Sequence, residues 1–253
     1  MGEILLETKG LTKKFFDLKA LDNVDLQVYR GEIVSLIGPN GAGKTTLFNC
    51  ISGLMLPTSG KILFKGENIT GLPPHKIALK GITRTFQLIR LFRKLTVIEN
   101  LLLAVQMFQG EFVLGSVLNS PSVKRMESEA KEKANEILEL LGLKHLKNEY
   151  AHNLSYGQQK LLEIGMALMP NPDLVMLDEP TAAVNPTLIN EIKDRIQQLN
   201  KRGQTFFIIE HNMDVVMDLS KRIIVLSSGK KIAEGSPAEI KNNEKVIEAY
   251  FGE

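Results

Sequence analysis

The residues best suited to chemistry begin with a glycine-rich segment that follows a short apolar run. Its spacing, G-x-x-x-x-G-K-T, lets backbone N–H groups curl around an anion at angles that a Cβ would block. The run Ile33–Ile37 precedes it, and Thr46–Ile51 can continue as a helix whose free N–H groups attract phosphate. This context disfavours a bare glycine-rich turn. The residues predicted to bind a nucleotide are Gly38, Pro39, Asn40, Gly41, Ala42, Gly43, Lys44, Thr45 and Thr46.

Two carboxylates follow a second buried apolar run. Asp178 and Glu179 come directly after Leu174–Leu177, and ligands of open α/β sheets lie beyond such strand ends. We expect Lys44 to reach the β and γ phosphates, and Thr45 and Asp178 to hold Mg²⁺. Glu179 is then placed to act as general base on an attacking water. The alternative, a solvated acidic strand end before a proline, is disfavoured downstream of a phosphate-binding loop.

A histidine follows a third apolar run. His211 comes shortly after Thr205–Ile209, where an imidazole donor can contact a γ-phosphate and distinguish a triphosphate from a diphosphate. The alternative interpretation is that His211, as a lone histidine, has a structural role only. The other histidines, His75, His145 and His152, show no mutual metal-ligand spacing, and the chain has a single cysteine, so we expect no zinc site.

The length and composition fit one elaborated globular domain. At about 150 residues per domain, 253 residues exceed one domain and fall short of two. The chain is 43% hydrophobic and 24% charged, which excludes a disordered chain, and its net charge of +2 does not argue for a nucleic-acid partner. The lone Cys50 favours a reducing compartment. Met1–Thr8 lacks the features of a secretory signal, and no apolar run reaches the roughly 18 residues of a membrane span.

The pattern of apolar runs predicts an α/β fold, a P-loop NTPase core with an antiparallel β subdomain. Turns at Asp22-Asn23 and Arg30-Gly31 separate the early β segments, which are Ile4–Glu7, Leu26–Tyr29, Ile33–Ile37 and Lys61–Ile69. Near-continuous apolar runs predict buried parallel strands at Leu174–Leu177, Thr205–Ile209 and Ile223–Leu226. The helical spacing in Pro186–Lys201 predicts a helix between the first two of these.

A helical subdomain is predicted over residues 88–168, inserted into a core formed by residues 1–87 and 169–253 of one domain. Six basic and six acidic residues between Pro121 and Tyr150 cancel, which indicates a solvated helix face. Gly142 is a plausible helix stop. One apolar stripe is expected to face the core, formed by Met126, Ala130, Ala134, Ile137, Leu138 and Leu141.

The motifs together resemble those of the ATP-binding-cassette (ABC) family, in order and over essentially the whole chain. The segment Leu154-Ser155-Tyr156-Gly157-Gln158, here termed the signature segment, is similar to the L-S-G-G-Q loop of that family. Gln87 resembles its Q-loop glutamine and Ala183–Pro186 its D-loop. His211 resembles its switch histidine, and Phe15 falls where the family stacks a ring on adenine.

This resemblance implies ATP and Mg²⁺ as cofactors and Glu179, His211 and Gln87 as catalytic residues, with Gln87 also near the metal. It implies a head-to-tail dimer with a second ABC ATPase subunit, a further copy or a related chain. Ser155, Gly157 and Gln158 of one subunit would then cap the ATP held by the other. Transmembrane permease subunits would dock at the helical subdomain, on the cytoplasmic face of the membrane, and a solute-binding protein would be an indirect partner.

The residues after Gln87 are the candidates for the permease contact. They are Ile89, Arg90, Leu91, Phe92 and Arg93. The alternative is ordinary core packing for Leu91 and exposure to solvent for the arginines.

A finer resemblance is to the ATPase subunits of branched-chain amino-acid importers. It rests on Arg84–Phe92, on the signature segment followed by Gln159, on Asn185-Pro186 and on the ending Ile247–Gly252. The ATPases of lipopolysaccharide-type exporters are the nearest alternative. A soluble ABC ATPase acting on DNA or ribosomes is disfavoured, because such proteins usually carry coiled coils or two fused cassettes. A small-molecule kinase is disfavoured by the signature segment.

Three residues depart from the family pattern. Tyr156 replaces the first signature glycine, and we expect its ring to point away from a bound phosphate. Asn185 replaces the usual D-loop aspartate, so the D-loop lacks the charge through which that aspartate could interact. Met166 stands where many cassettes have an arginine, so a local ion pair is expected to be missing.

Overall fold

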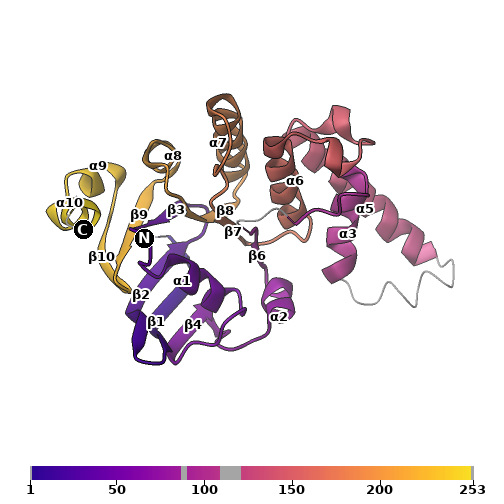
Figure 1. The fold of residues 1–253 in the computed structure, drawn as a ribbon. Helices are drawn as coiled ribbons and strands as arrows, with labels where there is room; N and C mark the ends of the chain where they lie inside the picture. Colours follow the sequence, from indigo (N-terminus) through magenta and orange to yellow (C-terminus); the bar gives the residue numbers. More distant parts are fainter. Residues whose placement is uncertain (1, 87–89, 109–120, 252–253) are drawn as a thin grey trace.

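The computed structural model describes residues 2–86, 90–108 and 121–251, and its centre is a six-stranded sheet (Figure 1). All neighbouring strands are parallel except the edge pair β10–β9. The order across the sheet is β10 (Lys230–Gly235), β9 (Arg222–Ser227), β3 (Ile33–Ile37), β8 (Thr205–Ile209), β7 (Leu174–Asp178) and β6 (Ile82–Arg84). The α/β class and the three predicted buried parallel strands are therefore confirmed. Ile33–Ile37, expected among the early β segments, is instead the parallel strand β3 of this sheet, and β6 and β10 were not predicted.

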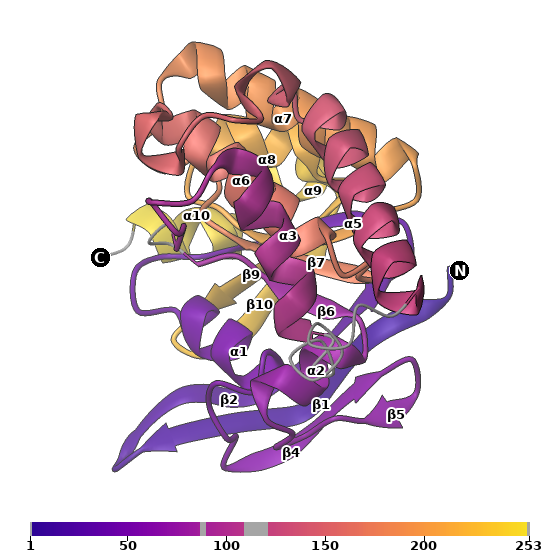
Figure 2. The same ribbon diagram turned by 90° about the vertical axis from the view of Figure 1, so that its right-hand side faces the viewer.

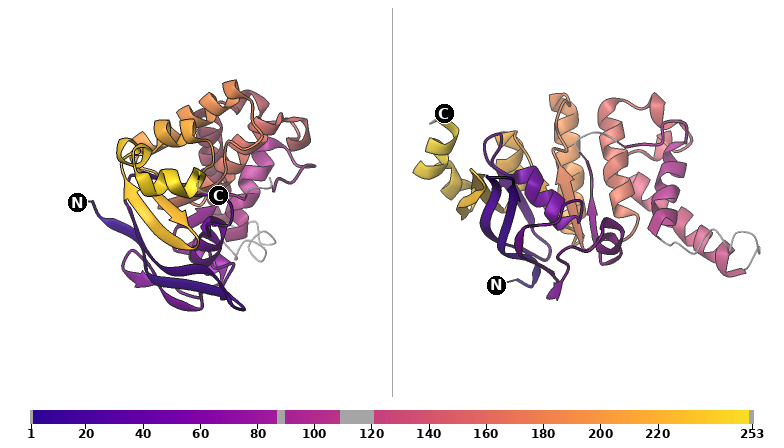
Figure 3. Two further views of the ribbon diagram at one scale, coloured as in Figure 1. Left: turned by 60° about the vertical axis from the view of Figure 1, so that its left-hand side comes forward. Right: turned by 60° about the horizontal axis from the view of Figure 1, so that its bottom comes forward.

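An antiparallel sheet packs beside this core. Its order is β2 (Leu18–Tyr29), β1 (Ile4–Phe15), β4 (Ser59–Phe64) and β5 (Glu67–Asn68). Strand β2 contacts β10, and Figure 3 shows the indigo strands beside the yellow C-terminal segment. The turn predicted at Asp22-Asn23 is wrong, because both residues lie inside β2. Asn23 has a φ of 56° next to register shifts in the β1–β2 pairing, so the local signal marked a bulge.

Helices cover both faces of the central sheet because its strands are apolar on both sides. Leu174 and Met176 of β7 pack in one core with helix α1 (Lys44–Ile51). Val175 and Leu177 pack in the other core with α6 (Tyr156–Leu168), α7 (Pro186–Lys201) and α8 (Met213–Leu219). Helices α1 and α6 thus lie on opposite faces of the sheet.

Residues 97–108 and 121–168 form a helical region at one end of the molecule (Figures 1 and 2). It contains α3 (Val97–Phe108), α5 (Pro121–Leu140), two 3₁₀ turns (Lys144–Leu146 and Ala151–Asn153) and α6. Gly142, with a φ of 72°, follows the end of α5 as predicted. The stripe is confirmed at Ala134, Ile137, Leu138 and Leu141, which are buried. Met126 is 39% exposed, because the first turns of α5 extend beyond the core of this region.

Short helices complete the described chain. They are α2 (Pro74–Leu79), α9 (Pro237–Lys241) and α10 (Glu244–Phe251), and the last two lie at the end of the molecule opposite the helical region (Figure 1). Of the helices described, none combines the length and the apolar character that crossing a membrane requires.

Candidate nucleotide-binding site

The glycine-rich loop connects the buried strand β3 to α1, as the sequence predicts. Gly38 and Gly43 have φ values of 152° and 99°, and a Cβ on either would lie within 2.4 Å of a neighbouring backbone oxygen. A Cβ on Gly41 would meet nothing within 4 Å, so the loop is open at its tip. Gly43 caps α1 without a side-chain hydrogen bond, and the first turn of α1 carries no acid. These helix N–H groups remain available to an anion.

Lys44 is held inside the loop it belongs to. Its Nζ donates to the carbonyl oxygens of Gly38 and Pro39 at 2.7 and 2.8 Å. Burial lowers the pKa of Lys44, and the carboxylates of Glu179 and Asp178 oppose this shift. The ammonium therefore lies in the field of both acids, at the place where phosphate oxygens would need a cation.

Asp178 is the last residue of β7, and a buried arginine holds it. Nη2 of Arg84 donates to Oδ2 of Asp178 at 2.8 Å, and both side chains are 6% exposed. Arg84 also donates to Asn49 Oδ1 and Ser52 Oγ on and after α1. The expected Mg²⁺ ligand is thus fixed from both β6 and α1. Sequence analysis gave Arg84 no role at this site, although its place shortly before Gln87 was a usable signal.

Glu179 adopts a left-handed backbone conformation, with a φ of 51°. Its N–H donates to the Ile209 carbonyl at 2.9 Å, which ties it to the end of β8. Oε1 of Glu179 lies 3.0 Å from Nε2 of His211. The structure therefore brings together the predicted base and the predicted γ-phosphate sensor, although they are far apart in sequence.

Glu210 builds the turn that carries His211. It is buried and accepts the N–H and hydroxyl of Thr181 and the N–H groups of His211 and Asn212. These bonds join the segment after Glu179 to the segment after β8. Glu210 is a second residue that sequence analysis missed. The sequence Glu210-His211 does not show that the glutamate is the buried residue of the two.

The signature segment lies on the other face of the sheet. Ser155 caps α6, with Gln158 N–H donating to Ser155 Oγ at 3.3 Å and Ser155 N–H donating to Gln158 Oε1 at 2.9 Å. Gly157 is packed so closely on α7 that a Cβ would lie 1.7 Å from Leu188 Cδ2. Since α6 and α1 cover opposite faces, the segment is placed apart from the loop of its own chain.

The remaining predicted residues are those of the first turn of α1, the expected adenine contact and two residues that follow β6 in the sequence. Thr45 is exposed and Thr46 half-buried on the first turn of α1. Phe15 ends β1 and is partly exposed, with Lys13 Nζ 5.1 Å from its ring centroid. The same hairpin reaches the loop, because Ala20 O is the atom that a Cβ on Gly43 would meet. Gln87 and Ile89 lie outside the described residues.

The loop fits a nucleoside triphosphate with its metal. The N-terminus of α1 has no side-chain cap, and Gly38 and Gly43 leave no room for a Cβ beside neighbouring backbone oxygens. A buried ammonium, that of Lys44, lies near two carboxylates. The donors suit phosphate oxygens, and the hydroxyl and carboxylate of Thr45 and Asp178 are hard oxygen ligands of the kind Mg²⁺ prefers.

Comparison with known proteins gives the family. Residues 21–182 match the family model described as "ABC transporter". The chain belongs to the ABC transporter family. Residues 230–253 of this cassette also match a model described as "Branched-chain amino acid ATP-binding cassette transporter".

The cassette is similar to known proteins over most or all of its length. It is 46% identical to the high-affinity branched-chain amino acid transport ATP-binding protein LivG of Escherichia coli K12, over 254 aligned residues and all of both chains. The ADP conformation of another cassette of an ABC transporter matches with a TM-score of 0.86 and 39% identity, over 99% of each chain. A dimeric post-hydrolysis cassette bound to ADP and Pi matches with a TM-score of 0.75 and 29% identity, over 92% of this chain and 99% of that one.

The departures from the ABC pattern have local structural explanations. The exposed Tyr156 ring lies over Lys160 Nζ, at 5.9 Å from its centroid, one turn along α6. Asn185 caps α7, where its Oδ1 accepts from Leu188 N–H at 3.0 Å, a role that Asn and Asp share. Met166 packs against the core that contains α6, so an apolar contact occupies this place.

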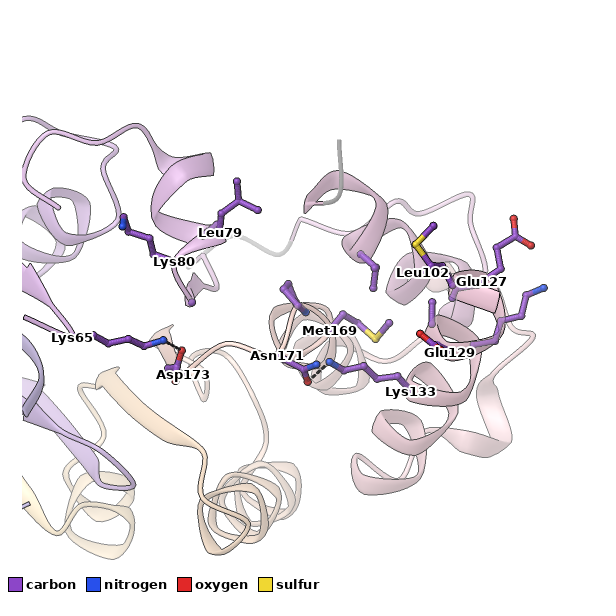
Figure 4. Close-up of a pocket in the computed structure, with 17 residues that line it drawn as sticks. Lys65, Leu79, Lys80, Leu102, Glu127, Glu129, Lys133, Met169, Asn171 and Asp173 are labelled. Carbon is purple, nitrogen blue, oxygen red and sulfur yellow. Dashed lines mark hydrogen bonds and ion pairs between the residues drawn. The ribbon is translucent and has the colours of Figure 1, made fainter. Parts of the chain in front are cut away.

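A hollow of this cassette is lined by none of the residues of the nucleotide loop, and Figure 4 shows the side chains around it. Its cavity volume is about 620 Å³, and it lies between α2, α3, α5 and the residues before β6 and β7. Lys65 pairs there with Asp173, and Lys133 donates to Asn171. Burial lowers the pKa of Lys133 to about 8. Because this hollow is at the amino ends of the strands, it is separate from the nucleotide site.

Proposed function

We propose that the chain is the ATP-hydrolysing subunit that powers an ABC importer of branched-chain or related amino acids. The observation that carries this proposal is the full-length similarity to LivG, with the C-terminal model match as a second support. The site supplies the chemistry expected of an ABC ATPase: a phosphate loop, two acids at the end of β7, and a histidine at the end of β8.

The residues of one chain can bind and orient ATP. Lys44 and the α1 N–H groups bind phosphate, and Thr45, Asp178 and Gln87 would hold Mg²⁺, which supplies charge neutralisation when bound. Glu179 would take the proton of the attacking water, and His211, at 3.0 Å from Glu179, would keep the carboxylate aimed and contact the γ-phosphate. Phe15 would stack on the adenine ring.

A second cassette would complete the site. Charge stabilisation is also needed on the far side of the γ-phosphate, and the signature segment lies on the face of the sheet opposite α1. In a head-to-tail dimer, Ser155, Gly157 and Gln158 of one cassette would cap the ATP of the other. A similar cassette is dimeric when bound to ADP and Pi, which supports the pairing of two cassettes. The second cassette is either another copy or a sister chain.

The membrane partners follow from the same assignment. Transmembrane permease subunits would dock against the helical subdomain, formed by residues 88–168, and leave residues 1–87 and 169–253 to bind nucleotide. The chain would then be peripheral, on the cytoplasmic face of the membrane, with a solute-binding protein as an indirect partner.

The test combines hydrolysis with partner identification. The full chain is expected to hydrolyse ATP without any acceptor substrate, and Lys44→Ala to lose most ATP affinity in a direct binding titration. Affinity purification from native membranes should recover a permease and an amino-acid-binding protein. Recovery of lipopolysaccharide-export subunits instead would reject import, and a requirement for an acceptor would indicate a kinase.

A further inference from the structure

The last described helix, α10, packs beside the nucleotide loop, although the nucleotide chemistry assigns it no role. Val246 of α10 is buried in one core with Ile37 and Val216. Ile37 is the last residue of β3 and directly precedes Gly38 of the loop. Val216 belongs to α8, the helix that begins shortly after His211. Helix α10 therefore packs on the elements that carry two parts of the nucleotide site.

Helix α10 lies on the face of the central sheet opposite α1. Strand β9 shows this, because Val225 packs in the core that contains Val246 of α10, and the next residue, Leu226, packs in the core that contains Leu47 of α1. Successive residues of a strand point to opposite faces. Figure 1 shows α9 and α10 beside β9 and β10. A side chain of α10 therefore approaches the loop from the side away from the α1 N–H groups.

Tyr250 makes this approach. It lies one turn after Val246, on the same side of α10. Partial burial raises the pKa of the Tyr250 phenol, and a hydrogen bond with the backbone of Gly38 opposes the shift. A bond that lowers the pKa of a phenol favours the anion, so the backbone group is a donor, the Gly38 N–H. At the start of α10, Asn243 Oδ1 accepts the Lys245 N–H at 3.0 Å, which helps to fix the helix.

Gly38 is thereby held at both of its backbone groups. Its N–H donates to Tyr250 Oη, and its carbonyl accepts from Lys44 Nζ at 2.7 Å. The β9–β10 turn holds a later part of the loop, since the Gly229 N–H donates to the Ala42 carbonyl at 3.1 Å. If the ammonium of Lys44 turns to a phosphate, the Gly38 carbonyl loses that partner, and the bonds from Tyr250 and Gly229 remain to hold the loop.

We propose that Tyr250 is a positioning residue for nucleotide binding, which holds the loop in the shape that receives phosphate. The inference rests on ATP binding at this loop, which is part of the proposed function. A loop that is already held in its binding shape loses less freedom when the ligand binds. Because Tyr250 acts on the loop backbone, it contributes to the affinity for ATP and ADP alike and leaves the chemistry at the γ-phosphate unchanged.

Tyr250→Phe tests the proposal, because it removes the hydroxyl and keeps the ring. The Kd of the isolated chain for ATP and the Kd for ADP should each rise about fivefold, as expected for the loss of one hydrogen bond. In the complex purified from membranes, kcat at saturating ATP should change less than about twofold, so that the loss appears in KM. Tyr29→Phe is the matched control. It removes a hydroxyl bond on β2, from Tyr29 Oη to Gln27 Oε1 at 2.8 Å, and should leave both Kd values unchanged.

Amide hydrogen exchange tests the bond itself, in the isolated chain without nucleotide. The Gly38 N–H should exchange about fivefold faster in Tyr250→Phe than in wild type. The Glu179 N–H, which donates to the Ile209 carbonyl, should exchange at the same rate in both.

Three results would overturn the proposal. They are an unchanged exchange rate at Gly38, unchanged Kd values despite faster exchange, and a lower Tm of Tyr250→Phe with both Kd values kept, which would show a structural role only. Failure of the proposed function is distinct, because the wild-type chain would then not bind ATP.

Discussion

Backbone strain at a single residue aims the expected general base. Glu179 has a left-handed φ of 51°, a conformation that costs a non-glycine residue about 1–3 kcal/mol. The bond from its N–H to Ile209 and the contact of its carboxylate with His211 hold it there. A strained residue at the end of a buried strand points its side chain where an unstrained one would not. The strain therefore serves the geometry of the site.

Glu179→Gln is expected to separate binding from hydrolysis. The amide keeps the shape of the side chain but cannot take a proton from water, and a positioned base contributes about 10²–10⁴-fold. ATP affinity should stay near wild type, hydrolysis should fall by at least about 100-fold, and a dimer should accumulate with ATP. Binding titration, phosphate release and size-exclusion chromatography check these three outcomes. Hydrolysis near the wild-type rate would reject the role of Glu179.

Glu163 gives a pH dependence to folding stability. Its pKa is raised from 4.5 to about 7, so between these values the folded chain holds a proton that the unfolded chain has lost. The stability from this group is full below pH 4.5 and is lost as pH rises through 7. Relative to Glu163→Gln, wild type should lose about 1–3 kcal/mol of unfolding free energy between pH 5 and pH 8.

Urea unfolding of both proteins at the two pH values measures this difference. Glu132→Gln, a change at the surface of α5, should follow wild type at both. A difference between wild type and Glu163→Gln that does not depend on pH would contradict the raised pKa.

Residues in motifs were predictable, whereas residues that support them were not. Lys44, Asp178 and Glu179 stand in a sequence context that predicts nucleotide binding and hydrolysis. Arg84 and Glu163 act through burial, and a sequence shows an arginine or a glutamate without showing whether it faces solvent. Only the fold places Arg84 on Asp178 and Glu163 on Phe86.

Among the elements, the segment after the Q-loop is built to present a side chain. The buried Asn100 of α3 accepts the Phe92 N–H at 2.9 Å and donates to its carbonyl at 3.2 Å. Phe92 is nevertheless 46% exposed, and the neighbouring Arg93 is exposed. A fixed backbone with an exposed aromatic ring is typical of an anchor for a partner.

Phe92→Ala and Arg93→Ala should each weaken the association with permease subunits. We expect about a tenfold loss, because an aromatic or arginine anchor contributes more than 1 kcal/mol. ATP binding by the isolated chain should be unchanged, since the backbone bonds to Asn100 remain. Co-purification from membranes measures the effect, with Phe16→Ala as control, a fully exposed phenylalanine on the β1–β2 turn. Undiminished co-purification would remove this surface from the interface.

The buried parallel strands and the helix that connects two of them were the most predictable elements. Strands β3 and β8 and helix α7 have the predicted bounds, because parallel strands covered on both faces leave uninterrupted apolar runs. Strand β6 has three residues, too few for a pattern. The Asn23 bulge was mistaken for a turn, because a positive φ suits asparagine in both.

At the scale of the molecule, the central sheet lies between the helix that carries the phosphate loop and the helix that carries the signature segment. The phosphate loop starts α1 on one face, and the signature segment starts α6 on the other. We therefore expect that the signature segment does not reach a γ-phosphate held by the loop of its own chain. If the signature segment acts on ATP, it acts on the ATP of another cassette.

Dilution tests this requirement directly. Below the dissociation constant of the dimer, the dimer fraction follows mass action, so the specific hydrolysis rate of the isolated chain should fall about tenfold for each tenfold dilution. ATP binding per chain should stay constant, because Lys44 and the α1 N–H groups come from one copy. Gly157→Ala should abolish hydrolysis at all concentrations, since its Cβ overlaps Leu188 and displaces the start of α6. A specific rate independent of concentration, in a preparation shown to be monomeric by light scattering, would mean that one chain completes the site alone.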